Sequence, residues 1–207
     1  KGTENIFRIA KENNFKVVFA SSSSVYGDVS RIPIKEDFAR NPINPYGNTK
    51  LEDEFLAEKY CNEGVEIIGL RYFNVFGIGQ TGSYAGVITK FMNQLIKKLP
   101  PKIYGDGSQI RDFVFVKDVA IANISAMQSK VKSGFFNIGT GKTVSIKQLA
   151  HMMIEIYGLS LQPQFLEPLE GDIKKSQADT SLTKKMIGWE YKTSLRDGLV
   201  KIVKNIN

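Results

Sequence analysis

The 207-residue chain is 42% hydrophobic and 24% charged, an ordinary composition for a globular protein with one sizeable core. It has no apolar run of 18 residues, one cysteine and one histidine. These counts exclude a membrane-spanning helix, an internal disulfide and a multi-histidine metal site, so we expect no metal and no membrane partner. The net charge of +7 comes from dispersed lysines without an aromatic–basic array, which argues against nucleic-acid binding.

Helix and strand patterns alternate along the chain. In chain order they predict a helix over 3–14, a strand over 16–20, a helix over 45–64, a strand over 65–70, a helix over 87–98, a short segment at 102–105, a strand over 112–116, a helix over 117–129, a strand over 134–138, a helix over 145–157, and helices around Leu182 and Leu195. The βαβ order indicates a parallel sheet.

Tyr46 and Lys50 stand four residues apart at the start of the second predicted helix, about twenty residues after the serine run 21–24. A helix places such a pair on one face, where the ammonium favours the phenolate. The serines follow a predicted strand, and open α/β sheets bind ligands at the carboxyl ends of their strands. Such a trio of side chains can take a proton from a sugar or alcohol hydroxyl. The spacing alone arises about once by chance in this composition, so its context decides.

Six segments in order resemble the extended short-chain dehydrogenase/reductase superfamily, particularly the NAD-dependent nucleotide-sugar epimerases of the UDP-galactose and UDP-N-acetylglucosamine 4-epimerase type. They are residues 21–27, 46–50, 70–77, 104–113, 136–141 and 171–172. The resemblance implies an α/β fold: the C-terminal part of a Rossmann-like, doubly wound parallel sheet plus a smaller α/β substrate-binding lobe. Residues 1–76 would belong to the NAD-binding domain. Residues 77–207 would form mainly the sugar-nucleotide lobe, with segments returning to the sheet.

Members of this family open with a Gly-x-x-Gly-x-x-Gly turn that holds the NAD pyrophosphate, and this chain has no such turn. Its first residues resemble the middle of the family's fourth helix. We therefore expect an N-terminally truncated chain that binds NAD weakly, if at all. Residues 139–141, Gly-Thr-Gly, follow a late strand and lack the spacing of the missing turn.

The resemblance also implies roles for individual residues. Tyr46 would be the base, Lys50 would favour its phenolate, and Ser22 would relay or orient the proton, with Ser23 as the fallback. The residues expected to contact NAD are Ser21, Tyr46, Lys50, Tyr72 and Phe73. The residues expected to contact the UDP-sugar are Ser22, Ser23, Asn74, Gln80, Gly86, Val87, Tyr104, Arg111, Asp172 and Ser176.

Two positions bear on the substrate. Leu169 stands where the family often has an arginine, which removes one expected phosphate contact. Ser176 stands at the family's gating position, and a small side chain there, with small Gly86 and amide-bearing Gln80, favours a 2-acetamido sugar.

The implied activity is NAD-dependent C4 epimerisation of a UDP-hexose or UDP-N-acetylhexosamine through a 4-keto sugar, by a cytoplasmic homodimer paired through helices. A sugar-nucleotide dehydratase is disfavoured because the family's Asp-Glu pair after the catalytic hydroxyl is here Ser23-Ser24. A catalytically inert sugar-nucleotide-binding fragment stays open, as does an α/β domain with an incidental Tyr and Lys.

Overall fold

A three-stranded parallel sheet organises the first half of the computed structural model, which describes residues 1–80, 86–169, 171 and 173–205. Its strands are β1 (Val17–Ser22), β2 (Ile67–Tyr72) and β7 (Gly134–Ile138), in the order β1-β2-β7. β1 pairs with β2 along its whole length, and β7 pairs with the other edge of β2. A strand from the second half of the chain therefore completes the sheet.

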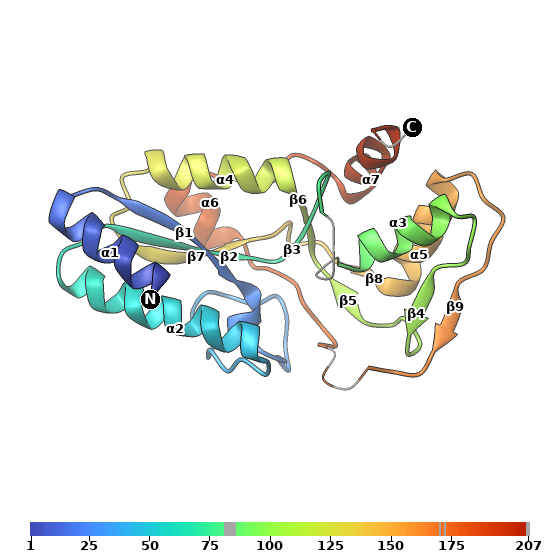
Figure 1. Cartoon of the computed structure of the whole chain (residues 1–207), viewed down its shortest axis with the longest axis horizontal. Coiled ribbons are helices and arrows are strands. Elements are labelled where there is room, and N and C mark those ends of the chain that lie inside the picture. The colour runs from blue at the N-terminus through green and yellow to red at the C-terminus, as the bar shows by residue number, and fades with distance from the viewer. Residues whose placement is uncertain (81–85, 170, 172, 206–207) are drawn as a thin grey trace.

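Helices cover both faces of this sheet (Figure 1). α1 (Gly2–Asn13) and α2 (Pro45–Asn62) lie on one face, and α4 (Val116–Gln128) and α6 (Ser181–Ile187) lie on the other. β2 is consequently buried on both sides, which explains its continuous apolar run before Arg71. The predicted α/β class with a parallel, doubly wound sheet is confirmed.

The rest of the chain, apart from β7, α4 and α6, forms mainly a smaller α/β lobe on the right of Figure 1. Its strand pairs are β3 (Asn74–Phe76) with β6 (Phe113–Phe115), β4 (Lys102–Tyr104) with β9 (Gln164–Leu166), and β5 (Ile110–Arg111) with β8 (Val144–Ser145). Its helices are α3 (Val87–Ile96), α5 (Ile146–Ile156) and α7 (Leu195–Lys204). No described helix has the length and apolarity needed to cross a bilayer.

Separate apolar clusters hold the two halves. Ile68, Leu70 and Phe136 of the sheet pack with Trp189 beneath α4. The lobe has its own buried cluster, which includes Phe91 of α3. The division of the chain at residue 76 stays a prediction, because β3 and β6 lie between the two halves and contribute to the lobe's cluster as well.

Local signals in the sequence fix the ends of two helices that matter for the site. α2 begins with Pro45 at its first position, and the Asn44 side chain accepts a hydrogen bond from the Gly47 N–H at 2.8 Å. α5 begins with a capping box, in which Ser145 and Gln148 exchange side-chain and backbone hydrogen bonds.

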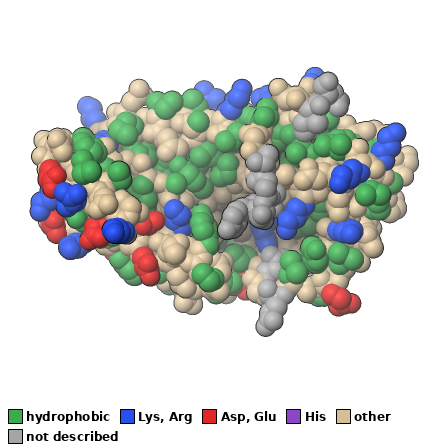
Figure 2. Space-filling model, in the orientation of Figure 1, with side chains coloured by type: hydrophobic (Ala, Val, Ile, Leu, Met, Phe, Trp, Pro, Cys, Tyr) green, Lys and Arg blue, Asp and Glu red, His purple; other side chains and the backbone are tan. Residues whose placement is uncertain are grey.

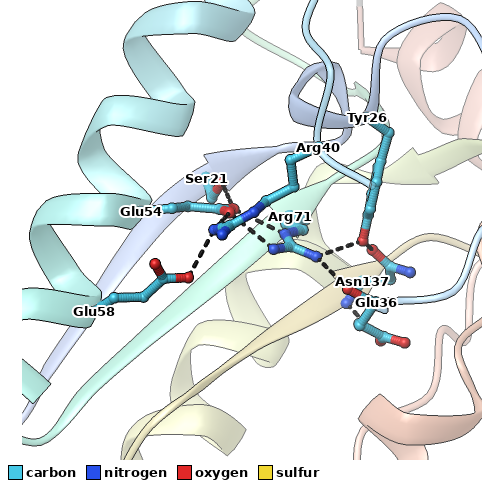
Figure 3. Close-up of polar contacts among 8 residues, drawn as sticks. All are labelled: Ser21, Tyr26, Glu36, Arg40, Glu54, Glu58, Arg71 and Asn137. Atoms are coloured by element: carbon cyan, nitrogen blue, oxygen red, sulfur yellow. Dashed lines mark hydrogen bonds and ion pairs between the residues drawn. The ribbon is translucent and has the colours of Figure 1, made fainter. Parts of the chain in front are cut away.

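A buried ion pair joins α2 to the middle of the sheet (Figure 3). The guanidinium of Arg71 on β2 donates from Nε and Nη2 to the two carboxylate oxygens of Glu54 on α2, each at 2.8 Å. Glu54 also accepts from the Ser21 hydroxyl of β1 at 2.6 Å and from Arg40 at 3.1 Å. Both members of the pair are almost fully buried. A buried pair of this kind stabilises the fold only while every polar group in it is satisfied.

On the opposite side, Arg71 continues this network towards β7 and the loop before α2. Its Nη1 donates to the Tyr26 hydroxyl at 2.8 Å and to the Glu36 carbonyl at 2.9 Å. Tyr26 donates in turn to the Asn137 side chain of β7 at 2.8 Å. One arginine therefore links all three strands, α2 and the 3₁₀ turn η1 (Ser23–Tyr26).

We predict that Glu54→Ala lowers the free energy of unfolding by about 3–5 kcal/mol, because it leaves the Arg71 charge buried without its partner. Urea unfolding followed by circular dichroism measures this change. Glu12→Ala is the matched control, since Glu12 pairs with Arg8 at the surface and such pairs contribute about 0–1 kcal/mol. Equal, small losses for both variants would contradict the structural role of the buried pair.

Candidate functional site

Tyr46 and Lys50 lie on the first two turns of α2, beyond the carboxyl end of β1. The Tyr46 side chain is 57% exposed, so its hydroxyl is open to a ligand. The Lys50 ammonium lies 6.0 Å from the centre of the Tyr46 ring and donates to the Ala20 carbonyl at 2.9 Å. Asp53 lies 3.7 Å from the same ammonium. The lysine is thus held against the strand end with its charge beside the phenol, as the i, i+4 spacing predicts.

Ser22 is the last residue of β1, and its buried hydroxyl contacts the Ser24 hydroxyl at 3.1 Å. Gly47 brings this segment close to the turn that carries Tyr46. A Cβ at Gly47 would lie 2.7 Å from the Ser24 carbonyl oxygen, a distance that real Cβ atoms do not adopt. The close approach of α2 to η1 therefore requires glycine directly after Tyr46, which explains Tyr-Gly in this sequence.

Three predicted NAD-binding residues have partners in the protein interior. Ser21 donates to Glu54, and the Tyr72 hydroxyl donates to Asn123 at 2.9 Å. Phe73 is buried in a cluster with Val25. The cofactor roles of all five residues stay predictions, and Tyr46 is the exposed one among them.

Tyr26, the nearest alternative phenol, is unsuited to act as a base. Burial raises its pKa to about 12, although the neighbouring Arg71 acts in the opposite direction. Its oxygen is already engaged by Arg71 and Asn137. Of these two tyrosines, Tyr46 is the exposed one, and its proton-transfer role stays a prediction.

A cavity of about 250 Å³ in the lobe collects five of the predicted UDP-sugar residues. These five are Asn74, Gly86, Val87, Tyr104 and Arg111. The cavity thus brings together segments that are far apart in the sequence, namely the ends of β3, α3, β4 and β5. The other residues around the cavity are Lys90, Phe91, Lys102, Ile103, Gln109, Ile146 and Leu169.

The charged side chains among the described residues that line this cavity are all positive. Lys90, Lys102 and Arg111 line it, and none of the described residues that line it is acidic. In Figure 2 the right half of the face, which carries this lobe, shows Lys and Arg side chains and few acidic ones. Apolar side chains of Phe91, Ile103 and others cover the rest of its wall. Such a cavity suits a ligand with an anionic part and a flat apolar part.

The other described residues predicted to bind the substrate do not line this cavity. Gln80 accepts a hydrogen bond from Thr89 at 3.0 Å and lies next to Gly86. Ser23 begins η1. Ser176 is buried, and its N–H donates to the Ile110 carbonyl at 3.2 Å, beside Arg111. Asp172 lies outside the described residues.

Asp112, which follows Arg111, is a buried carboxylate that holds neighbouring loops in place. Nothing in the sequence indicated this role. Its two oxygens accept from the backbone N–H groups of Thr140, Gly141 and Ala178 at 2.8–3.0 Å and from the Thr140 hydroxyl. Burial raises its pKa, and these hydrogen bonds oppose that shift. The Gly-Thr-Gly loop therefore cradles an internal carboxylate, which agrees with its exclusion as a pyrophosphate turn.

Comparison with known proteins places this site in a family. The profile of the NAD dependent epimerase/dehydratase family matches residues 1–139. The chain belongs to this family.

Relatives in this family are named for nucleotide-sugar chemistry. A putative UDP-glucose 4-epimerase of Methanocaldococcus jannaschii is 36% identical to this chain. The match covers 98% of this chain and 67% of the relative. The structure of a UDP-N-acetylglucosamine 4-epimerase from Methanobrevibacter ruminantium, in complex with UDP-N-acetylmuramic acid, matches with a TM-score of 0.93 at 35% identity, over 98% of this chain and 66% of that one.

A third relative was solved with the cofactor. The UDP-glucuronic acid 4-epimerase from Bacillus cereus, in complex with UDP-glucuronic acid and NAD, matches with a TM-score of 0.89 at 31% identity, over 99% of this chain and 67% of that one. The chain spans about two thirds of the length of these relatives.

Tyr26 gives a prediction for alkaline pH. The folded state holds the phenol proton more tightly than the unfolded state, so the stabilisation is complete below pH 10 and is lost as the pH rises towards 12. We expect the unfolding free energy to fall less steeply between pH 10 and 12 in Tyr26→Phe than in the starting chain. Urea unfolding at several pH values measures the slope. Tyr46→Phe, at an exposed position, is the control, and identical slopes in all three proteins would contradict the prediction.

Proposed function

We propose that this chain carries the proton-transfer and sugar-nucleotide-binding residues of an NAD-dependent 4-epimerase, an isomerase of UDP-hexoses or UDP-N-acetylhexosamines. The observation that carries the proposal is the pairing of two features. An exposed Tyr46 with the Lys50 ammonium beside it lies at the carboxyl end of β1, and a cationic cavity is lined by the residues expected to bind UDP.

The proposed chemistry follows from the positions of these groups. Tyr46, as phenolate, takes the proton from the sugar 4-hydroxyl. It returns the proton after the sugar has presented its other face. Lys50 favours the phenolate electrostatically, and Ser22 orients the hydroxyl that is being oxidised. NAD supplies the hydride acceptor when bound. Return of the hydride to the other face of the 4-keto sugar inverts C4.

The residues of this chain fit one end of NAD. The exposed Tyr46 and the partly exposed Lys50 belong to one turn of α2, which suits the nicotinamide ribose. The Gly-x-Gly turn at residues 139–141, which follows β7, is already filled by the Asp112 carboxylate. The sequence contains no Gly-x-x-Gly-x-x-Gly pattern of the kind that holds the pyrophosphate in this family.

Two finer features support the same proposal. The exposed Ile6 of α1 and Phe55 of α2 lie on two helices that contact each other, which fits a homodimer paired through helices. The single cysteine, Cys61, is a free thiol whose pKa is raised by burial, which fits a cytoplasmic location.

The alternative reaction, dehydration of the sugar, lacks its acid and base here. Ser23 and Ser24 open η1, and no acidic residue lies in its first turn. A binding module without catalysis is the other alternative, and it makes the opposite prediction for the following assay.

The test is an assay of the product of the gene that encodes this sequence, with NAD and UDP-glucose or UDP-N-acetylglucosamine. We expect 4-epimer formation, a loss of about 10²–10⁴-fold in kcat for Tyr46→Phe, and a smaller loss for Ser22→Ala. Thr49→Ala, on the same turn of α2, is the control because its hydroxyl donates to the Tyr46 carbonyl and Thr49 is not among the predicted site residues. Binding of the UDP-sugar with no turnover would favour the module and overturn the proposal.

Ser176 gives a prediction on sugar choice. Its side chain is small and buried, and a tyrosine at this position would extend well beyond the space that the serine occupies. Ser176→Tyr should therefore lower kcat/KM for UDP-N-acetylglucosamine at least about tenfold while keeping that for UDP-glucose within about threefold. Ser176→Thr serves as the control for a small change. Equal effects on the two substrates would show that position 176 does not select the acetamido group.

A further inference from the structure

Two lysines of the cavity have no assigned role in the proposed reaction. Lys90 projects from the first turn of α3 and Lys102 begins β4, and both side chains line the cavity with Arg111. Within the described part of the chain, neither ammonium has a hydrogen bond or an ion pair. Most surface lysines are simply solvated. These two differ because they converge with a guanidinium on a hollow whose described wall contains no carboxylate.

The arrangement surrounds the cavity with positive charge from three elements. α3 provides Lys90 and its N-terminal backbone, where the helix dipole favours an anion. β4 provides Lys102, and Tyr104 lies on the same face of that strand two residues later. β5 provides Arg111. An anion in the cavity therefore meets cations from separate directions, while the Tyr104 ring can face a flat group.

The charge of the chain as a whole is divided in the same way. Residues 1–76 contain 10 Lys and Arg and 11 Asp and Glu, whereas residues 77–207 contain 18 and 10. The whole net positive charge thus belongs to residues 77–207, which form the lobe with the cavity and also supply β7, α4 and α6 to the sheet. Such a field attracts anionic ligands and raises their rate of association.

We propose that Lys90 and Lys102 are specificity-determining residues that bind the diphosphate of the nucleotide together with Arg111, and that they select diphosphate ligands over monophosphates. This inference rests on the proposed function, because it takes the cavity to be the nucleotide site. Leu169 lines the same cavity with an uncharged, 54% exposed side chain, so the lysines supply charge that this position does not.

The test is isothermal titration of the 207-residue chain with UDP, UMP and uridine, without NAD. We expect UDP to bind more tightly than UMP. Lys90→Ala/Lys102→Ala should weaken UDP binding by at least about tenfold, since each substitution removes a charge-assisted contact to the diphosphate, and should leave uridine binding within about twofold. The slope of log Kd against log salt should also fall in this variant. Lys97→Ala/Lys192→Ala, which removes two exposed lysines of the same part of the chain that do not line the cavity, is the matched control.

A rescue makes the assignment specific. Leu169→Arg places a new cation at the same cavity, so it should restore UDP affinity in the Lys90→Ala/Lys102→Ala background. Circular dichroism of each variant checks that it is folded. Unchanged UDP binding in the double variant, or an equal loss of UDP and uridine, would overturn the inference while leaving the epimerase proposal standing. Absence of UDP binding to the starting chain would overturn both, and absence of turnover alone would overturn only the epimerase proposal.

Discussion

The bidentate contact between Arg71 and Glu54 is the constraint on which the rest of the structure depends. Arg71 lies in the middle strand of a sheet that is covered on both faces, so its charge has no route to water. The cost of burying it is offset only by a complete set of partners, which come from α2, η1 and the Glu36 carbonyl. The positions of these elements relative to β2 are therefore fixed together.

The Arg71–Glu54 contact also fixes the orientation of the candidate site residues, because side chains alternate along β1 and recur every four residues on one face of α2. Ser21 faces Glu54, so Ser22 faces the opposite side of β1, towards Ser24. On α2, Tyr46, Lys50 and Glu54 follow one another at intervals of four. Side-chain exposure falls along this row, from 57% at Tyr46 to 23% at Lys50 and 0% at Glu54. One face of the helix thus runs from solvent to core, with the reactive pair at its open end and the anchor at its buried end.

Much of the fold could be predicted from the sequence because its signals are local. The strand at 134–138 appears with its predicted bounds, and the helix predicted over 145–157 spans Ile146–Ile156, with Ser145 and Tyr157 as its caps. An apolar run and helical periodicity need no distant information. β1 extends two residues beyond its predicted end. Ser21 and Ser22 have weak strand propensity, and pairing with Arg71 and Tyr72 of β2 keeps them extended.

The partners within the site could not be predicted in this way. Nothing local in Gly-Thr-Gly at 139–141 indicates that it receives the carboxylate of Asp112, almost thirty residues earlier. Arg71 inside an apolar strand was a visible signal that a buried partner exists, but its identity depends on how α2 crosses the sheet. The five cavity residues could be assigned to one site only through the family resemblance, because their segments meet only in the folded chain.

The most direct measurement is a crystal structure of the protein with UDP-glucose and NAD. The account predicts the diphosphate in the cavity formed by α3, β4 and β5, and the sugar 4-hydroxyl within about 2.6–3.2 Å of the Tyr46 hydroxyl, with Ser22 on the same side. A diphosphate bound elsewhere, or a sugar whose C4 faces away from Tyr46, would contradict it.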